Sequence, residues 1–247
     1  MRLYFIRHGQ SINNANVGNA EYNENPDPYL TQTGLEQAEL LAKYLKENQR
    51  VTNDKSWNNQ NQFDFGLTHI YTSLMERAAM TAAPTARALG IPFTSWMNIH
   101  EEGGIYAREK DFRNSVLPGR PRSFFEKNIP ELTLPDDFDE SGWWNRPFES
   151  EKERQPRADL VLSELIARHG DMEGQTEQHI AFISHGGFFM RFMSTLLTLP
   201  WRQGAHGMRS WFLLNNCSIS RVDIHTDWLT VCYINRTDHL PSHLISE

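Results

Sequence analysis

The chain has few cysteines and no excess of positive charge. Its 247 residues include two cysteines, Cys217 and Cys232, whose positions match neither a metal-binding nor a redox spacing, so we expect reduced side chains that serve packing. The formal net charge is -7 at pH 7, and the isoelectric point is near 5.8. This balance argues against general binding of nucleic acid or of an anionic membrane, so an anionic ligand would need a local cluster of arginines.

Long hydrophobic runs are also missing. No segment approaches the length that spans a bilayer. The apolar run near the N-terminus, residues 3–6, is too short for a secretory signal and is followed at once by Arg7 and His8. We therefore expect a cytoplasmic protein with no membrane partner. The length fits one large α/β domain over residues 1–247 that contains an insertion.

The first strand is the most informative stretch of the chain. Residues 3–6, Leu-Tyr-Phe-Ile, predict a short buried strand of a parallel sheet, which places Arg7 and His8 at its carboxyl end, where open α/β sheets bind ligands. A guanidinium has a fork that suits phosphate oxygens, and a neutral imidazole is a nucleophile. The pair fits binding and attack of a phosphoryl group. A strand that merely ends in two polar residues fits the tripeptide equally well.

Apolar periodicity predicts alternating strands and helices along the rest of the chain. We expect strands at residues 67–72, 91–96, 180–183, 211–214, 218–224 and 229–234, the last two as a hairpin, and helices that begin near Thr31 or Thr33, Ser73, Ala158 and Phe188. Pro84 is expected to kink or split the second helix, and Pro200 to stop the last one.

Three stretches lack this periodicity. Residues 12–27 are rich in asparagine and are expected to form a loop over the strand ends, and residues 48–62 a solvated surface loop. Residues 104–156 contain several prolines and are expected to form an inserted cap that decides specificity. We expect most cations of this insert to be ordinary solvated charges; they are Arg108, Lys110, Arg113, Arg120, Arg122 and Arg146.

Four phrases in the chain carry a resemblance to a known family. They are Arg7-His8-Gly9, the segment from Ser73 to Arg77, Glu101-Glu102-Gly103-Gly104, and Ser184-His185-Gly186-Gly187. Together they resemble the histidine phosphatase superfamily, also called the phosphoglycerate mutase-like family, over nearly the full length. The resemblance implies an α/β fold: a three-layer α/β/α sandwich with a mostly parallel central sheet, to which the inserted cap is added.

The resemblance also implies roles for individual residues. His8 would attack phosphorus and become a phosphohistidine, and Arg7, Arg77 and His185 would bind the phosphoryl group. Asn14 matches the asparagine that closes the family's Arg-His-Gly-x-Ser-x-x-Asn phrase, so its amide is expected on the phosphate.

Two further groups near the phosphate are less specific. The backbone amide of Gly186 is expected as an extra donor at the start of a helix. Ser11 could also reach the phosphate, although a hydroxyl in a turn is more often a local backbone partner.

The proton donor is one of two adjacent glutamates, Glu101 and Glu102. The phrase Ile99-His100-Glu101 matches the family better, so we expect Glu101 to protonate the leaving oxygen and Glu102 to be an ordinary surface acid. A zinc site made of both histidines and a glutamate is the chemical rival. Two permanent cations beside it would oppose a third, so we expect no metal and no other cofactor.

The expected activity is hydrolysis of a small-molecule phosphomonoester by a metal-independent histidine phosphatase. The sequence after Glu101 does not look like the insert of the cofactor-dependent mutases. A phosphoglycerate mutase-type phosphotransferase is the alternative, followed by an inactive phosphoester-binding or interaction protein. The substrate stays open, and edge strands near Trp211 or Trp228 could pair in a homodimer.

Overall fold

A six-stranded sheet forms the middle of the molecule. The computed structural model describes residues 1–49, 64–108, 114–171, 176–199 and 211–247, and the strand order in the sheet is β3-β2-β6-β1-β7-β8. The first four of these strands run parallel to one another, and β7 and β8 are added by antiparallel pairing. The strands are β1 (Arg2–Arg7), β2 (His69–Thr72), β3 (Phe93–Ser95), β6 (His179–Ser184), β7 (Ile219–Ile224) and β8 (Leu229–Arg236).

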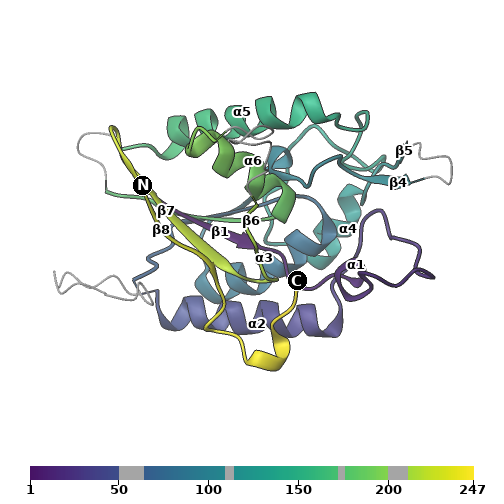
Figure 1. The fold of residues 1–247 in the computed structure, drawn as a ribbon, viewed down its shortest axis with the longest axis horizontal. Coiled ribbons are helices and arrows are strands. Elements are labelled where there is room, and N and C mark those ends of the chain that lie inside the picture. Colours follow the sequence, from purple (N-terminus) through teal and green to yellow (C-terminus); the bar gives the residue numbers. More distant parts are fainter. Residues whose placement is uncertain (50–63, 109–113, 172–175, 200–210) are drawn as a thin grey trace, which may run out of the picture.

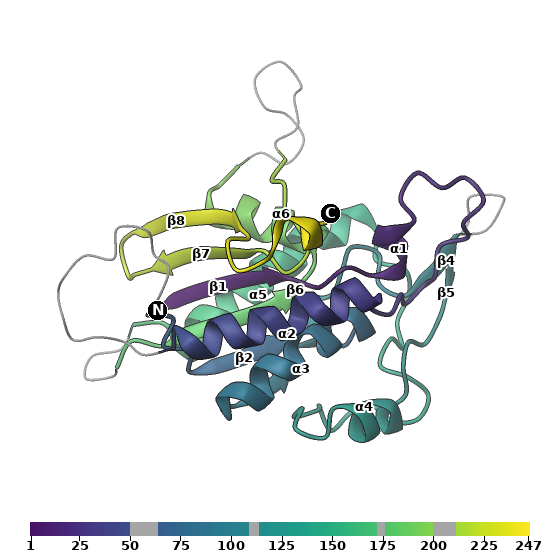
Figure 2. The same cartoon turned by 90° about the horizontal axis from the view of Figure 1, so that it is seen from below.

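Helices cover both faces of this sheet, as Figures 1 and 2 show. Helices α2 (Gln32–Glu47) and α3 (Glu76–Leu89) lie on one face, and α5 (Glu151–His169) and α6 (Gly186–Leu196) lie on the other. Alternate residues of β1 enter two separate cores: Tyr4 and Ile6 pack on the first face and Leu3 and Phe5 on the second. The predicted three-layer α/β/α fold with a mostly parallel sheet is confirmed.

Local signals explain where two of the helices begin and end. Thr31, not Thr33, is the N-cap of α2, and its hydroxyl accepts a hydrogen bond from the Gly34 amide at 3.1 Å. Helix α3 ends at Leu89, and Gly90 follows it in the left-handed conformation with φ of 62°. Pro84 lies inside α3, which continues through it, so the expected split of this helix is wrong.

Several predicted boundaries are wrong. Helix α5 begins at Glu151 rather than near Ala158, because Ser150 and Glu153 form a capping box ahead of it and Pro156 is accommodated inside the helix. Residues 211–214 form no strand, and the loop after β1 contains a short helix, α1 (Ile12–Ala15). The hairpin of β7 and β8 is confirmed.

The expected insert contains its own small elements. These are β4 (Tyr106–Arg108), β5 (Asn114–Val116) and α4 (Arg122–Asn128), and β4 pairs with β5 in a two-stranded ribbon. Two short 3₁₀ helices, Met97–Ile99 and Ser242–Leu244, complete the described elements. The predictions for residues 50–62, Lys110, Arg113 and Pro200 lie outside the described residues. No helix in the described ranges is long and apolar enough to cross a membrane.

Candidate active site

A cavity of about 200 Å³ opens at the carboxyl end of β1. Strand register explains why distant residues meet there: Arg7 pairs with Ser184 of the parallel neighbour β6, so His8 and His185 follow adjacent strands at the same edge of the sheet. Their ring centroids are 5.2 Å apart. His185 is not among the residues that line the cavity. The candidates from the sequence that do line it are Arg7, His8, Ser11, Asn14, Arg77, Glu101 and Glu102.

His8 is held as a neutral imidazole. Its Nδ1 lies 2.7 Å from the Gly9 carbonyl, which can only accept, so Nδ1 carries the proton. Its Nε2 accepts a hydrogen bond from Nε of Arg77 at 3.1 Å. Burial, followed by the charges of Arg77 and Arg7, holds the pKa of His8 well below its usual range. The unprotonated Nε2 therefore keeps the lone pair that a nucleophile needs.

Two buried guanidiniums stand beside this imidazole. Arg77 lies on the first turn of α3, as predicted, and is 7% exposed. Arg7 donates from Nη1 to the Leu214 carbonyl, while its buried Nε has no hydrogen-bond partner within the described part of the chain. Burial lowers the pKa of both guanidiniums, which nevertheless stay charged near neutral pH. This pair of cations suits the oxygens of a phosphoryl group.

His185 is fully buried and offers a second neutral ring. Its Nε2 lies 2.6 Å from the Ser73 hydroxyl, which accepts a hydrogen bond from the Met75 amide and so can direct its own proton toward the ring. When Nε2 accepts the Ser73 proton, the neutral ring carries its own proton on Nδ1. Nδ1 has no hydrogen-bond partner among the described residues. Burial, followed by the charge of Arg77, holds the pKa of His185 well below its usual range. His185 can therefore donate one hydrogen bond without being protonated.

The Asn14 side chain is oriented by its oxygen. Oδ1 accepts hydrogen bonds from the Ser11 amide at 3.1 Å, the Ser11 hydroxyl at 2.9 Å and Nδ2 of Asn216 at 3.2 Å. Its own amide nitrogen is the group left to donate to a ligand. The Asn14 backbone amide donates to the Ser11 hydroxyl at 3.3 Å, so Ser11 caps α1 and is a local partner of the backbone. Asn216 also donates to the His8 carbonyl and was missed by the sequence reasoning.

The Glu101 carboxylate lies against the start of α6. Oε1 accepts from the Phe188 amide at 3.0 Å and from the Glu102 amide at 2.8 Å, and Oε2 accepts from the Gly187 amide at 3.1 Å. Gly187 allows this approach, because a Cβ there would lie 2.4 Å from Oε1. Gly186, expected on the phosphate, lines an adjacent cavity with Arg7 rather than the first one.

Glu102 is not an ordinary surface acid, so that prediction is wrong. Its carboxylate accepts from Nε of Arg191 at 2.5 Å and from Nη1 of Arg154 at 2.7 Å, and 21% of its side chain is exposed. These partners come from α6 and α5, on the face of the sheet opposite α2 and α3. The two adjacent glutamates therefore use different sets of partners, as expected for neighbouring side chains that point in different directions.

The loop after β1 and the insert supply the outer wall of the cavity. Asn13, Glu24 and Asn25 line it from the loop, as expected for a segment over the strand ends, and Tyr106 and Arg108 line it from the insert. Three other cations of the insert have partners: Arg120 pairs with Glu76, Arg122 pairs with Glu126, and Arg146 lies over the Trp144 ring.

Buried Asp27 was not identified from the sequence. It lies between two prolines of the loop, and its Oδ1 accepts a hydrogen bond from the Glu76 amide at the start of α3. Burial is the main reason that the pKa of Asp27 is raised to about 6. Over the described residues, no three His, Cys, Asp or Glu side chains are grouped so that they could hold a metal ion.

Known proteins resemble this chain in sequence and in fold. The family model described as "Histidine phosphatase superfamily (branch 1)" matches residues 3–56 and 60–237. A protein of Yersinia pestis (strain Pestoides F) named "Probable phosphoglycerate mutase GpmB" is 28% identical over 250 aligned residues, which cover 99% of this chain and 95% of that protein.

Two solved structures share the fold. A phosphoserine phosphatase from Entamoeba histolytica, in complex with 3-phosphoglyceric acid, is 20% identical with a TM-score of 0.57, and the match covers 97% of this chain and 99% of that one. A mycobacterial glucosyl-3-phosphoglycerate phosphatase, in complex with VO3, is 18% identical with a TM-score of 0.56, and the match covers 96% of this chain and 99% of that one.

Proposed function

The chain belongs to the histidine phosphatase superfamily, and from that premise we propose that it is a metal-independent phosphomonoester hydrolase that works through a phosphohistidine on His8. The observation that carries the proposal is the state of His8: a buried neutral imidazole whose unprotonated Nε2 lies against Arg77 and beside Arg7. A nucleophile of this kind needs cations over the equatorial oxygens and an acid for the leaving group. The side chains around the cavity can supply both.

The first step forms the phosphohistidine. Nε2 of His8 attacks phosphorus, the bond between phosphorus and the ester oxygen breaks, and Glu101 delivers its proton to that oxygen as the alcohol leaves. Arg7 and Arg77 stabilise the charge on the equatorial oxygens, and His185 and Asn14 donate further hydrogen bonds. The unpartnered Nδ1 of His185 and the amide nitrogen of Asn14 support these roles.

The second step releases phosphate. Glu101, now a carboxylate, takes a proton from water as the water oxygen bonds to phosphorus. The bond between phosphorus and Nε2 breaks, which restores neutral His8 and frees inorganic phosphate. The contacts of Glu101 with the Gly187 and Phe188 amides keep the carboxylate at the start of α6 between the two steps.

The wall of the cavity supports a small polar substrate. Its volume is about 200 Å³, and the side chains around it are mostly polar or charged. Tyr106 and Arg108 belong to the expected insert over residues 104–156, which supports the proposal that this insert selects the substrate. Similar proteins that are named phosphatases act on phosphoserine and a glucosyl-phosphoglycerate, which is consistent with such a substrate.

A mutase is the second candidate, because the Yersinia relative is named a probable phosphoglycerate mutase. The two activities are separated by incubating the protein with a panel of phosphomonoesters and with 3-phosphoglycerate, with and without a chelator. Hydrolysis predicts free phosphate in both conditions and its loss in His8→Ala. Accumulation of 2-phosphoglycerate without phosphate would select the mutase, and no turnover of any ester would select a binding protein.

Two expectations from the sequence stay predictions. The cytoplasmic location can be checked by cell fractionation. The homodimer can be checked by light scattering in solution. The edge of the sheet available for pairing is β8, next to Trp228, since the segment around Trp211 forms no strand.

A further inference from the structure

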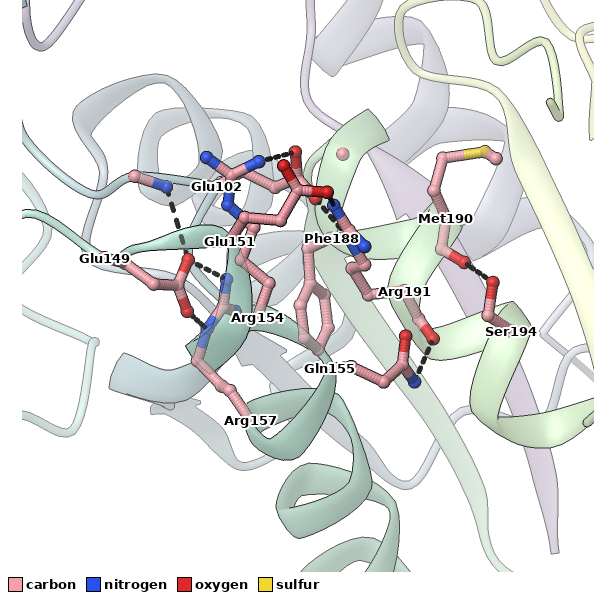
Figure 3. Close-up of polar contacts among 12 residues, drawn as sticks. Glu102, Glu149, Glu151, Arg154, Gln155, Arg157, Phe188, Met190, Arg191 and Ser194 are labelled. Atoms are coloured by element: carbon pink, nitrogen blue, oxygen red, sulfur yellow. Dashed lines mark hydrogen bonds and ion pairs between the residues drawn. The ribbon is translucent and has the colours of Figure 1, made fainter. Parts of the chain in front are cut away.

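The segment that bears Glu101 is held on both sides by charged residues from α5, α6 and the residues just before α5. Figure 3 shows Glu149 bound to Arg157, and Glu102 bound to Arg154 and Arg191. We call Glu149, Arg154, Arg157 and Arg191 the cradle. All four lie far from Glu101 in the sequence, so the fold brings them to this segment.

The residue after Glu101 is fixed by two arginines of the cradle. Arg191 donates from Nε to Glu102 at 2.5 Å and is only 2% exposed. Arg154 donates from Nη1 to the other carboxylate oxygen at 2.7 Å. A second carboxylate, Glu151, lies 3.4 Å from Nη2 of Arg191. Glu102 is therefore tied to α6 and α5 at the same time.

The residues on the other side of Glu101 are held through their backbone. Arg157 donates from Nη1 to the carbonyls of Asn98 at 2.8 Å and His100 at 3.0 Å. Its partner Glu149, at 2.5 Å from Nε, accepts from the Gly103 amide at 3.2 Å. The backbone on both flanks of Glu101 thus has charged partners, Arg157 on α5 and Glu149 just before it.

The cost of burial indicates what these ion pairs are for. Taking a guanidinium and a carboxylate out of water costs about as much as their attraction returns, so buried pairs are weak contributors to stability. They do fix geometry, because a pair that separates leaves its charges uncompensated where water cannot fully solvate them. A proton donor must lie within hydrogen-bond reach of the leaving oxygen, so fixed geometry matters more here than at a surface site.

We propose that Glu102, through its partly buried ion pair with Arg191, is a positioning residue for the proton donor Glu101. The inference rests on the proposed function. Glu101 keeps two amide contacts with α6, and Glu102 fixes the next residue to the same helix, so the carboxylate cannot drift along the cavity wall. Glu102 also lines the cavity, whereas Arg191 does not, so R191K breaks the pair and loosens Glu101 without removing a group from the cavity wall.

The test compares two esters that need the proton donor to different extents. An alkyl phosphomonoester has a basic leaving oxygen that must be protonated, whereas 4-nitrophenyl phosphate has an acidic one that departs with little help. Measured as kcat/KM, which reports the step up to release of the alcohol, E101Q should lose about 100-fold or more on the alkyl ester. E102Q and R191K should each lose about tenfold on the alkyl ester. On the aryl ester both should stay within about threefold of the unaltered protein.

Two controls separate positioning from general damage. Asp223 pairs with Arg221 near the opposite end of β1, and its burial is similar to that of Glu102. D223N should therefore leave kcat/KM unchanged on both esters. Inhibition by inorganic phosphate should be the same in E102Q and the unaltered protein. In the E101Q background, E102Q should cause no further loss, because Glu102 acts through Glu101.

Three outcomes would overturn the proposal. The first is that E102Q loses equally on both esters. The second is that the losses of E101Q and E102Q multiply in the double variant. The third is that E102Q alone loses as much as E101Q alone, which would make Glu102 a proton donor. Failure of the proposed function looks different. In that case the unaltered protein releases no phosphate from either ester, or His8→Ala releases it as fast.

Discussion

Gly187 is the position where the smallest change should disturb the proposed chemistry most. A Cβ added there would lie 2.4 Å from Oε1 of Glu101, 3.0 Å from Cγ of Glu102 and 3.1 Å from Cδ of Glu101. Ordinary contacts begin at 3.4 Å, so the carboxylate must move by about 1 Å in Gly187→Ala. Gly186 offers a matched comparison, because a Cβ there would meet only Nε of Arg7, at 3.9 Å.

The size of the effect follows from that displacement. A misplacement of about 1 Å at a reacting group costs about 100-fold in rate, so we expect a loss of about 100-fold in kcat/KM on an alkyl phosphomonoester. Stability should fall by at most about 2.5 kcal/mol. An alanine in the first turn of α6 gains about 0.5–1 kcal/mol over glycine, and crowding against Glu101 costs about 1–3 kcal/mol. Gly187→Ala should therefore remain folded while its rate falls.

The assay measures phosphate release and thermal unfolding for both alanine variants. Gly186→Ala should lose far less activity than Gly187→Ala, and its melting temperature should be at least as high as that of Gly187→Ala. If Gly187→Ala kept a kcat/KM within about threefold of Gly186→Ala, the carboxylate of Glu101 would not be needed where the structure places it, and its role as proton donor would be refuted.

Two further predictions concern stability. Buried His8, His100 and His185 have pKa values well below 6.5, so unfolding takes up protons at acid pH and the free energy of unfolding should fall as pH drops below about 6.5. Together the three imidazoles give the free energy of unfolding a slope of at most about 4 kcal/mol per pH unit, which Asp27 with its raised pKa partly offsets. The measurement is urea unfolding as a function of pH. A free energy of unfolding that stays constant down to about pH 5 would contradict three neutral imidazoles. Gly34→Ala should lower the free energy of unfolding by about 1–3 kcal/mol, because a Cβ there would lie 2.2 Å from the Gln10 carbonyl oxygen in the loop after β1. An unchanged midpoint of urea unfolding would show that this loop moves freely.

The convergence of the two histidines was predictable because it depends on strands. Apolar runs ending in Arg7-His8 and Ser184-His185 indicate two parallel strands, and parallel neighbours end at one edge of a sheet. The choice of Glu101 over Glu102 came from a family phrase, and the structure gives each glutamate separate partners. Their assigned roles remain proposals for the experiments above.

Partners that come from loops or distant helices carried no usable signal. Asn216 supports Asn14 and is a common polar residue with no motif around it. Ser73 begins one of the four family phrases, but nothing in that phrase indicates that its hydroxyl contacts His185. Arg191 lies inside an apolar helix and reaches Glu102 only because α6 packs beside the segment that carries it.

Two errors have plain physical causes. The capping box at Ser150 starts α5 well before its apolar positions, which were the signal used. The apolar run at residues 211–214 is not a strand, because no neighbouring strand pairs with it among the described residues.

Trapping the covalent intermediate tests the central claim most directly. The protein is mixed with a phosphomonoester labelled in its phosphoryl group, quenched in alkali within the first turnover, and mapped by peptide analysis. The account predicts one labelled residue, His8, and neither label nor phosphate release in His8→Ala. A label on another residue, or release by His8→Ala at the rate of the unaltered protein, would contradict it.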